Sequence, residues 1–562
     1  MSVEQSLALA PFNLSVEDIA WVRKTRDGLS TEAKVRQLFV PISIGDDLEN
    51  IKRLGNMKPG GLHRFMGPEL EPAWNATRQF LEMSEVPPFI SGDIEGGGHG
   101  SPAMLQFPNQ IGLAAANDTQ LSARLLDAVC QEAKAFGFNW SFTPVIDVNH
   151  NSESAIVGTR SYGSDLARIA AQSQTHVEVL QRNGIAATAK HWPGEGYDQR
   201  DQHLVTTINP LNMEEWHKIF GNLYKGLIDQ GLFTVMSAHI ALPAYAALKG
   251  VAESLERYRP ASASKILNFD LLRGELGFNG LVVSDATPMA GLTGFSSRAE
   301  QVPQVIENGC DVFLFSIDDE QDYQFMLKGL REKRLSEQRL EDAVTRILGL
   351  KAALGLHKKS VDQRIAPLAE VREIVKSKTH LALAQDVAGK SITLVKDVKA
   401  LLPLSPVKHK RIVMVDRGAP GMFPEMPRKP MAAFAAELEK RGFVLSKFDS
   451  NNQPTKENCD LLLYVFAVES SLGLSHIHVD WMAEQPGMSA AMRRYWDDVP
   501  CLMVSFGHPY YLRDMPRIPA YVNAYSTTVA VQVATVERLM GEKPFEGSSP
   551  IDAFAGAPDA RF

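Results

Sequence analysis

Gly280-Leu281-Val282-Val283-Ser284-Asp285 is a short apolar run that ends in a carboxylate, and similar runs recur along the first 355 residues. An apolar run of this length between turn signals is typical of a strand buried on both faces. Amphipathic stretches that suit helices lie between the runs, for example at 118–135, 166–183 and 213–230. We expect strands at 37–42, 88–93, 140–148, 185–191, 232–239, 261–264, 280–285 and 311–315. Eight strands alternating with helices predict a (β/α)8 barrel, similar to the TIM barrel.

Polar side chains lie at the carboxyl ends of these predicted strands. An aspartate after a strand is often only a helix N-cap, so each residue alone decides little. In this type of barrel, however, the carboxyl-end rim carries the active site. Six such residues at one rim predict a site there: Asp93, Asp147, Lys190, His191, His239 and Asp285.

The chain after Gly355 has the pattern of a second α/β domain. Apolar runs at 391–394, 411–415, 461–466 and 501–505 predict strands, and 379–389 and 431–441 predict helices. We therefore expect a catalytic barrel over 1–355, a linker over 356–376 and an α/β sandwich domain over 377–562.

Composition excludes several classes of function. The net charge of −8 and the absence of a lysine or arginine block argue against nucleic-acid binding. The four cysteines form no CxxC pair, and neither an HExxH motif nor a dinucleotide fingerprint is present, so we expect no metal and no organic cofactor. No apolar run is long enough to span a bilayer and no basic leader precedes Phe12, so we expect a soluble, cytoplasmic protein without a membrane partner. The oligomeric state stays open.

The segment from Ala189 to His203 is the most informative loop of the chain. It leaves a predicted strand, passes two glycines and a proline, and ends in Asp201-Gln202-His203. Asp201 can reach His203 and fix its tautomer, as the orienting carboxylate does in a catalytic triad. Asp285 at the rim would supply a carboxylate nucleophile opposite that histidine. On spacing alone a polar surface loop is the favoured interpretation, and the residues alone indicate only a hydrolase or a transferase.

Several motifs together resemble family 3 glycoside hydrolases, in their β-N-acetylglucosaminidase branch. Lys190-His191-Trp192-Pro193-Gly194 followed by Asp201-Gln202-His203 is similar to that branch's Lys-His-Phe-Pro-Gly…Asp-x-His loop. The resemblance extends over most of both predicted domains. It is carried further by 29–39, Asp93-Ile94-Glu95-Gly96-Gly97, 139–149, Arg160-Ser161-Tyr162-Gly163, Met236-Ser237-Ala238-His239, 277–285, 505–510 and 541–550.

The resemblance implies an exo-acting, retaining β-N-acetylglucosaminidase. Asp285 would be the nucleophile, and His203, oriented by Asp201, would be the acid/base group. Sugar contacts would come from Asp93, Arg160, Lys190 and His191, whereas Asp147, Asn149 and His239 would bind sugar, support the binding residues or be structural. The partner would be a small β-linked amino-sugar glycoside, with a role in recycling cell-wall or chitin fragments.

Two alternatives stay open within this reading. A histidine places no second negative charge beside the acceptor, so the same scaffold could use phosphate and act as a phosphorylase, or act on another β-glycoside. A protein that binds sugar without catalysis is the alternative from another class.

Three segments depart from the family pattern. Glu195 stands where that branch usually has a histidine, and Gly98-His99-Gly100-Ser101-Pro102 stands where it usually has an arginine-bearing run. The third segment, 58–72 with Arg64 and Phe65, is interpreted as an insertion that shapes the mouth or packs locally.

Overall fold

The computed structural model describes residues 2–421 and 427–562, apart from the side chain of His99. Its N-terminal two thirds form a closed ring of parallel strands. Neighbouring strands of the ring are joined by ladder pairs or, at β5–β6 and β10–β11, by single bridges such as Trp140 to Ala186 and Val283 to Val312. The strands in ring order are β1 (Phe39–Val40) continued by β2 (Ile42–Ile44), β3 (Gly61–Phe65), β4 (Phe89–Gly92), β5 (Trp140–Ser141), β6 (Thr188–Trp192), β8 (Thr234–Ser237), β10 (Leu281–Ser284) and β11 (Phe313–Leu314). Because β11 pairs with β1, the ring closes and the predicted (β/α)8 barrel is confirmed.

Two predictions inside the barrel were wrong. Residues 261–264 are not a strand, because Ala261–Ala263 form a 3-10 turn. Since β8 pairs directly with β10, with Thr234 opposite Leu281, the ring has no room for a strand between them. The missing strand is β3, which lies in the stretch interpreted as an insertion and pairs with both β2 and β4. The predicted number of eight strands is therefore right, although one predicted strand is absent and one real strand was not predicted.

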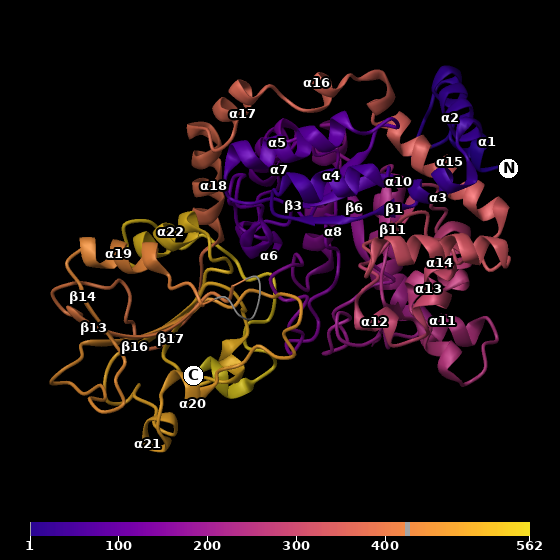
Figure 1. The fold of residues 1–562 in the computed structure, drawn as a ribbon. Helices are drawn as coiled ribbons and strands as arrows, with labels where there is room; N and C mark the ends of the chain where they lie inside the picture. The colour runs from indigo at the N-terminus through magenta and orange to yellow at the C-terminus, as the bar shows by residue number, and fades with distance from the viewer. Residues whose placement is uncertain (1, 422–426) are drawn as a thin grey trace.

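Amphipathic helices cover the outside of the ring (Figure 1). Several of them begin at side-chain caps that satisfy the first free N–H groups, as Asp118 does for α7 and Asp165 for α8. They include α4 (Leu48–Asn56), α5 (Leu70–Glu82), α7 (Thr119–Ala135), α8 (Leu166–Arg182), α10 (Asn222–Asp229), α13 (Arg298–Glu307), α14 (Asp319–Arg331) and α15 (Glu337–Ala353). The predicted helices at 118–135 and 166–183 are confirmed, and that at 213–230 is broken by a π-helical turn at His217–Gly221.

The C-terminal part is built around one six-stranded sheet. All neighbouring strands are parallel except β12 and β17, which are antiparallel. The order across the sheet is β12 (Thr393–Asp397), β17 (Ala520–Asn523), β16 (Cys501–Ser505), β15 (Leu461–Phe466), β13 (Arg411–Gly418) and β14 (Val444–Lys447). β15 is buried throughout because Leu461, Leu463 and Val465 belong to one core and Leu462 and Tyr464 to another, on opposite faces. The four predicted strands are present, and β14 and β17 are additional.

The two parts are joined by α16 (Val361–Arg364), α17 (Leu368–Ile374) and α18 (Lys378–Ser391), which run along one side of the barrel in Figure 1. α18 contacts α6 (Gln110–Ala116) and α7 of the barrel and α22 (Val529–Leu539) of the second part. The barrel core includes Val387 and the next core begins at Ala388, so this helix belongs to both. The division at 355 and 376 stays a prediction. No helix among the described residues is long and apolar enough to cross a membrane.

Candidate active site

The predicted site residues lie at the carboxyl-end rim of the barrel. Asp93 directly follows β4, Lys190 and His191 are in β6, and Asp285 directly follows β10. Asp147 lies beyond β5, and its Oδ1 accepts from the N–H of His191, so it reaches the same rim. His239 follows β8 by two residues. The structure therefore brings the strand ends together as the pattern of the sequence predicted.

Asp285 has two unlike oxygens. Oδ1 accepts from the N–H of Ala286 at 2.7 Å, whereas Oδ2 is buried and has no hydrogen-bond partner among the described residues. Burial alone would raise the pKa of Asp285. The positive charges that His191, His239 and His203 can carry, together with the Ala286 N–H, outweigh burial and lower it. Asp285 is therefore an anion at neutral pH with one oxygen free to react.

Asp201 and His203 form the predicted pair. Oδ1 of Asp201 accepts from Nδ1 of His203 at 2.7 Å and from its backbone N–H at 2.9 Å. With Nδ1 donating, Nε2 of the imidazole is the nitrogen that can hold or release a proton. Burial would raise the pKa of Asp201, but the bonds from His203 and from the Gly473 N–H lower it. The His203 side chain is 22% exposed, so it can reach a bound molecule.

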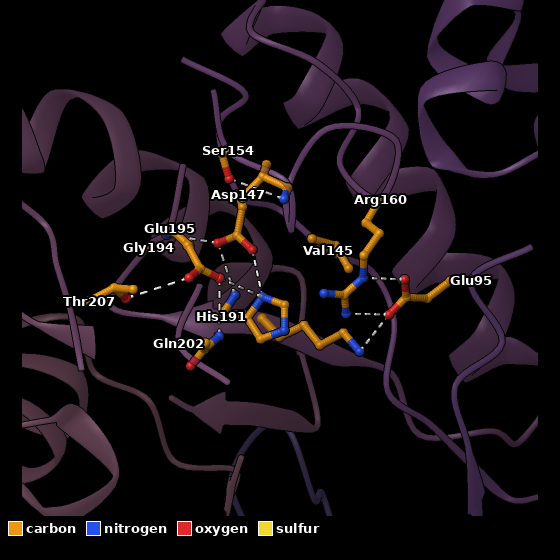
Figure 2. Close-up of polar contacts among 12 residues, drawn as sticks. Glu95, Val145, Asp147, Ser154, Arg160, His191, Gly194, Glu195, Gln202 and Thr207 are labelled. Carbon is orange, nitrogen blue, oxygen red and sulfur yellow. Dashed lines mark hydrogen bonds and ion pairs between the residues drawn. The ribbon is translucent and has the colours of Figure 1, made fainter. Parts of the chain in front are cut away.

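A second group of charges, the rim ion cluster, consists of Asp93, Glu95, Arg160 and Lys190. Nζ of Lys190 lies 2.9 Å from Oδ1 of Asp93 and 2.8 Å from Oε1 of Glu95. The guanidinium of Arg160 donates to both oxygens of Glu95 at 2.9 Å, in the two-pronged geometry of strong arginine–carboxylate pairs (Figure 2). Burial would lower the pKa of Lys190 and of Arg160, but the two carboxylates raise both. Two cations and two carboxylates therefore lie in direct contact and neutralise one another.

His191 is held by Asp147 beside the rim ion cluster. Oδ2 of Asp147 lies 2.6 Å from Nδ1 of His191, and Oδ1 of Asp147 accepts from the N–H groups of His191 and Glu195. With Nδ1 donating to Asp147, the imidazole keeps Nε2 for another partner. Figure 2 shows Asp147 and Glu195 facing the imidazole from the same side. Asp147 thus orients His191 as a supporting residue.

His239 and Asn149 differ in what they offer. The His239 ring is saturated, because Nε2 donates to the Ala286 carbonyl at 2.9 Å and Nδ1 accepts from Oγ of Ser262 at 2.8 Å. It therefore fixes the backbone next to Asp285. The amide nitrogen of Asn149 donates to the carbonyl of Gly158 at 2.9 Å, but its Oδ1 is buried without a partner among the described residues.

Asp147, His191 and Glu195 could also be considered as metal ligands. One ligand atom from each lies within 4.8 Å of the others. Nδ1 of His191 and Oδ2 of Asp147 are already joined by a 2.6 Å hydrogen bond, however. Burial first, and then the negative charge of Asp147, raise the pKa of Glu195 well above its ordinary value. A cation here would have to break the bond between His191 and Asp147 and would compete with the protonated form of Glu195. The three side chains are therefore better matched to hydrogen bonding with one another.

The second domain reaches this rim, which the sequence did not indicate. The N–H of Gly473 donates to Oδ2 of Asp201 at 3.0 Å. Oγ of Ser470 accepts from the N–H of Thr159, and Oγ1 of Thr159 accepts from the N–H of Ser470. Glu469 accepts from the N–H of Gly98 at 3.0 Å. Residues 469–473 therefore support the loops that carry Asp201 and Arg160.

Sequence reasoning missed two barrel residues for different reasons. Glu95 stands inside the Asp93–Gly97 element that was singled out, and the two cations at the same rim were a signal that a second anion was needed. His63 lies on β3, whose strand character was not recognised; its Nε2 is 3.4 Å from Oδ2 of Asp93, and its ring stacks on Phe142.

Comparison with known proteins shows the family of this chain. The family model described as glycosyl hydrolase family 3 N terminal domain matches residues 31–350. A beta-N-acetylglucosaminidase/beta-glucosidase of Cellulomonas fimi is 37% identical over 571 aligned residues, which cover 98% of this chain and 99% of the relative. Among solved structures, the beta-glucoside phosphorylase BglX has a TM-score of 0.90 at 35% identity, over 99% of this chain and 100% of that chain.

A beta-N-acetylglucosaminidase from Paenibacillus sp. str. FPU-7 has a TM-score of 0.79 and covers 94% of this chain and 100% of that chain. At 23% identity it supports the fold alone. The family model covers more than half of the chain and the Cellulomonas relative spans nearly all of it, so both resemblance and enzyme class are confirmed. The chain is an enzyme that belongs to glycoside hydrolase family 3.

Proposed function

We propose that this chain is an exo-acting, retaining β-glycosidase with Asp285 as nucleophile and His203 as acid/base group. The observation that carries the proposal is the pairing of functions at one rim. Asp285 offers a buried anionic oxygen that has no hydrogen-bond partner among the described residues, and His203 has its Nδ1 fixed by Asp201 so that Nε2 is the working nitrogen. This is the nucleophile and acid/base division of a retaining double displacement, with a histidine in place of the second carboxylate.

The reaction follows in two steps. Oδ2 of Asp285 attacks the anomeric carbon, the glycosidic C–O bond breaks, and Nε2–H of His203 protonates the leaving oxygen. The resulting glycosyl ester is then attacked by water. Nε2 of His203 takes the proton from this water, the sugar leaves with its original β configuration, and the carboxylate of Asp285 is regenerated.

The rim ion cluster and His191 supply the sugar-binding surface in this proposal. Charged side chains form short, directional hydrogen bonds to hydroxyl groups. Because Lys190 and Arg160 are held by Asp93 and Glu95, they meet the sugar without reorganising, which favours tight positioning. Residues 469–473 contact the barrel loops beside Asp201 and Gly98, and in this proposal the second domain limits the site to one terminal sugar.

The preferred substrate in the proposal is a β-N-acetylglucosaminide, with β-glucosides accepted as well. The name of the Cellulomonas relative joins these two activities. A panel of p-nitrophenyl β-glycosides that differ only at carbon 2 (acetamido, hydroxyl, amino) tests this directly. We expect the highest kcat/KM for the acetamido sugar and measurable turnover of the hydroxyl sugar. A clear preference for the hydroxyl sugar would overturn the assignment of substrate but not of reaction.

The stereochemistry tests the mechanism separately. Proton NMR of the first sugar released should show the β anomer, followed by slow mutarotation. An α anomer appearing first would mean single displacement and would remove Asp285 from the role of nucleophile.

Phosphorolysis is a second candidate function, and one specific comparison favours it. The beta-glucoside phosphorylase BglX matches both domains over its full length. In chemical terms, phosphate replaces water in the second step, so that its oxygen attacks the anomeric carbon and a β-sugar 1-phosphate leaves Asp285. A neutral imidazole repels this anion less than a second carboxylate would. Phosphorus NMR of the products, with and without millimolar phosphate, decides between the two: a sugar 1-phosphate signal supports phosphorolysis, and free sugar alone supports hydrolysis.

A further inference from the structure

Gln202, the residue between Asp201 and His203, has a fully buried side chain. Its Oε1 accepts from the N–H of His239 at 2.9 Å, and its Nε2 donates to Oε2 of Glu195 at 3.0 Å. The amide therefore connects the acid/base segment to the end of β8 and to the loop after β6. A long polar side chain is not buried in this way without cost, because its rotamer freedom is lost and each polar atom needs a partner.

Glu195 is equally enclosed. Its backbone N–H donates to Oδ1 of Asp147 at 2.9 Å, and Figure 2 shows its carboxyl group between Asp147, Gln202 and Thr207. Burial first, then the negative charges of Asp147, Asp201 and Asp285, raise its pKa, and the positive charge of Arg160 opposes them. Its surroundings therefore favour the protonated form of Glu195, which accepts from Gln202 without adding a charge beside His203.

The loop that carries Glu195 has little freedom to move. Gly194 and Gly196 adopt φ of +118° and +108°, and a Cβ on Gly196 would lie 1.9 Å from the carbonyl oxygen of Val148. Such a position admits glycine only. The oxygen that Gln202 binds is thus fixed by the barrel.

The same segment is tied to the nucleophile loop through its backbone. The carbonyls of Gln202 and His203 accept from the N–H groups of Gly291 and Ala290, a few residues after Asp285. On the side-chain route, Gln202 binds the N–H of His239, and the ring of His239 binds the carbonyl of Ala286. Two independent connections therefore join the acid/base segment to the nucleophile.

We propose that Gln202 is a positioning residue that sets the place of His203 relative to Asp285, and that Glu195 holds Gln202 for this task. This inference rests on the proposed function. It also accounts for the departure at Glu195, since Gln202 and Glu195 are partners.

Removing the amide should harm proton donation more than nucleophilic attack. Gln202→Leu loses both bonds and frees the segment on the side facing β6 and β8. A general acid displaced by about 1 Å can lose on the order of 100-fold in rate. An activated leaving group needs little protonation, whereas an alkyl leaving group needs a positioned acid.

The experiment compares kcat and KM for a p-nitrophenyl and a methyl β-glycoside of the preferred sugar. For Gln202→Leu we expect about a 100-fold loss of kcat on the methyl glycoside and less than about 10-fold on the p-nitrophenyl glycoside. Glu195→Ala should show the same pattern, and Glu195→Gln should restore most of the loss, because its amide oxygen still accepts from Gln202. The matched control is Gln324→Leu, which breaks an exposed amide–carboxylate bond to Glu320 on α14 and should change neither rate.

His203→Ala separates the two levels of the proposal. If His203→Ala shows the leaving-group difference and folded Gln202→Leu does not, the positioning role is wrong and the proposed function stands. If His203→Ala itself affects both substrates equally, the acid/base assignment fails. Melting temperatures are measured for every variant, and Gln202→Met serves as a second replacement of similar length. Should both Gln202 variants unfold, the Glu195→Ala and Glu195→Gln pair decides: equal leaving-group ratios in these two variants overturn the inference.

Discussion

The two charged regions at the barrel rim satisfy their charges in opposite ways. In the rim ion cluster, Asp93, Glu95, Arg160 and Lys190 neutralise one another over distances of 2.8 to 2.9 Å. Around Asp285 no cation is in direct contact among the described residues, and one carboxylate oxygen is buried without a hydrogen bond. Both regions lie at the carboxyl ends of strands of the same barrel, so the difference arises from side chains and not from the fold.

This difference suits the rim ion cluster to binding and Asp285 to reaction. A saturated ion cluster presents a rigid surface, and its groups are costly to remove but do not change charge near neutral pH. An oxygen without a partner is destabilised in the free enzyme, and bond formation to a substrate relieves it. Charges that are already paired suit binding, and the buried oxygen without a partner suits chemistry. Three predictions test this contrast.

The largest effect is expected for Asp285→Asn. The amide is nearly the same size and uncharged, so the fold should stay intact, but it cannot form the glycosyl ester. We expect kcat to fall by about 10⁴- to 10⁶-fold, as for other enzymes that lose their nucleophile. Mass spectrometry after incubation with a 2-deoxy-2-fluoro glycoside should show one added sugar on the wild type and none on the variant.

Asp270→Asn, at an exposed site on the outside of the barrel, is the matched control and should behave as the wild type. A labelled Asp285→Asn protein would place the nucleophile elsewhere.

The next effect concerns the rim ion cluster and is expected in stability as well as binding. Glu95→Gln leaves Arg160 without its anion and Lys190 with only Asp93, inside a buried site. Breaking a buried ion pair by removing one partner costs roughly 3–5 kcal/mol of unfolding free energy. KM should rise because the cations are no longer held in place. Denaturant unfolding and steady-state kinetics measure the two.

The control for Glu95 is a pair with the same two-pronged geometry at the surface. Arg441 donates to both oxygens of Glu542 at 2.7 and 2.8 Å, and Glu542→Gln should cost less than about 1 kcal/mol because exposed pairs are weak. If Glu95→Gln and Glu542→Gln lower the unfolding free energy by the same amount, the rim ion cluster is no more strongly held than an exposed ion pair.

Much of the barrel could be predicted from the sequence because a parallel barrel strand is buried on both faces. Runs such as 281–284 are continuous and apolar, and they end where the polar residues begin. The exception is instructive. β3 reads Gly-Leu-His-Arg-Phe, and each of its two polar side chains has a polar partner inside the barrel: Ser91 for His63, and Asp46 for Arg64. Polarity that is paired in three dimensions has no one-dimensional signature, so the sequence pattern indicates an insertion here and not a strand.

The site shows the same limit. The Asp201–His203 pair is local, and two residues of separation suffice to predict the contact. The bond from Gly473 to Asp201 spans 272 residues and is made by a backbone N–H, which any residue except proline carries. No residue type marks such a donor. The sequence shows Glu195 only as a departure from the family pattern. The structure shows that its carboxyl group accepts a hydrogen bond from Gln202.

The smallest effect is a pH dependence that compares one carboxyl from each region. Lys190 and His63 overcome the effect of burial and hold the pKa of Asp93 well below its ordinary value, whereas burial and Asp147 raise that of Glu195. Asp93 therefore stabilises the fold at every pH above about 4, the unfolded pKa of an aspartate, and this contribution is lost only as the pH falls through the folded pKa.

The contribution of Glu195 to the unfolding free energy changes with pH in the opposite direction. Above about pH 4.3 the unfolded chain releases this proton and the folded chain keeps it. The unfolding free energy therefore falls as the pH rises toward the folded pKa, by up to about 1.4 kcal/mol per pH unit.

Glu195→Gln removes that proton without changing the shape of the side chain, so the variant isolates the contribution of Glu195. Between pH 5 and 8 the unfolding free energy of the wild type should fall relative to that of Glu195→Gln, whereas its difference from Asp93→Asn should stay constant. Urea unfolding at several pH values measures both differences. If the curves of the wild type and Glu195→Gln run parallel, Glu195 is ionised in the folded protein, and the acid/base region then carries a buried negative charge that Gln202 must bind as an anion.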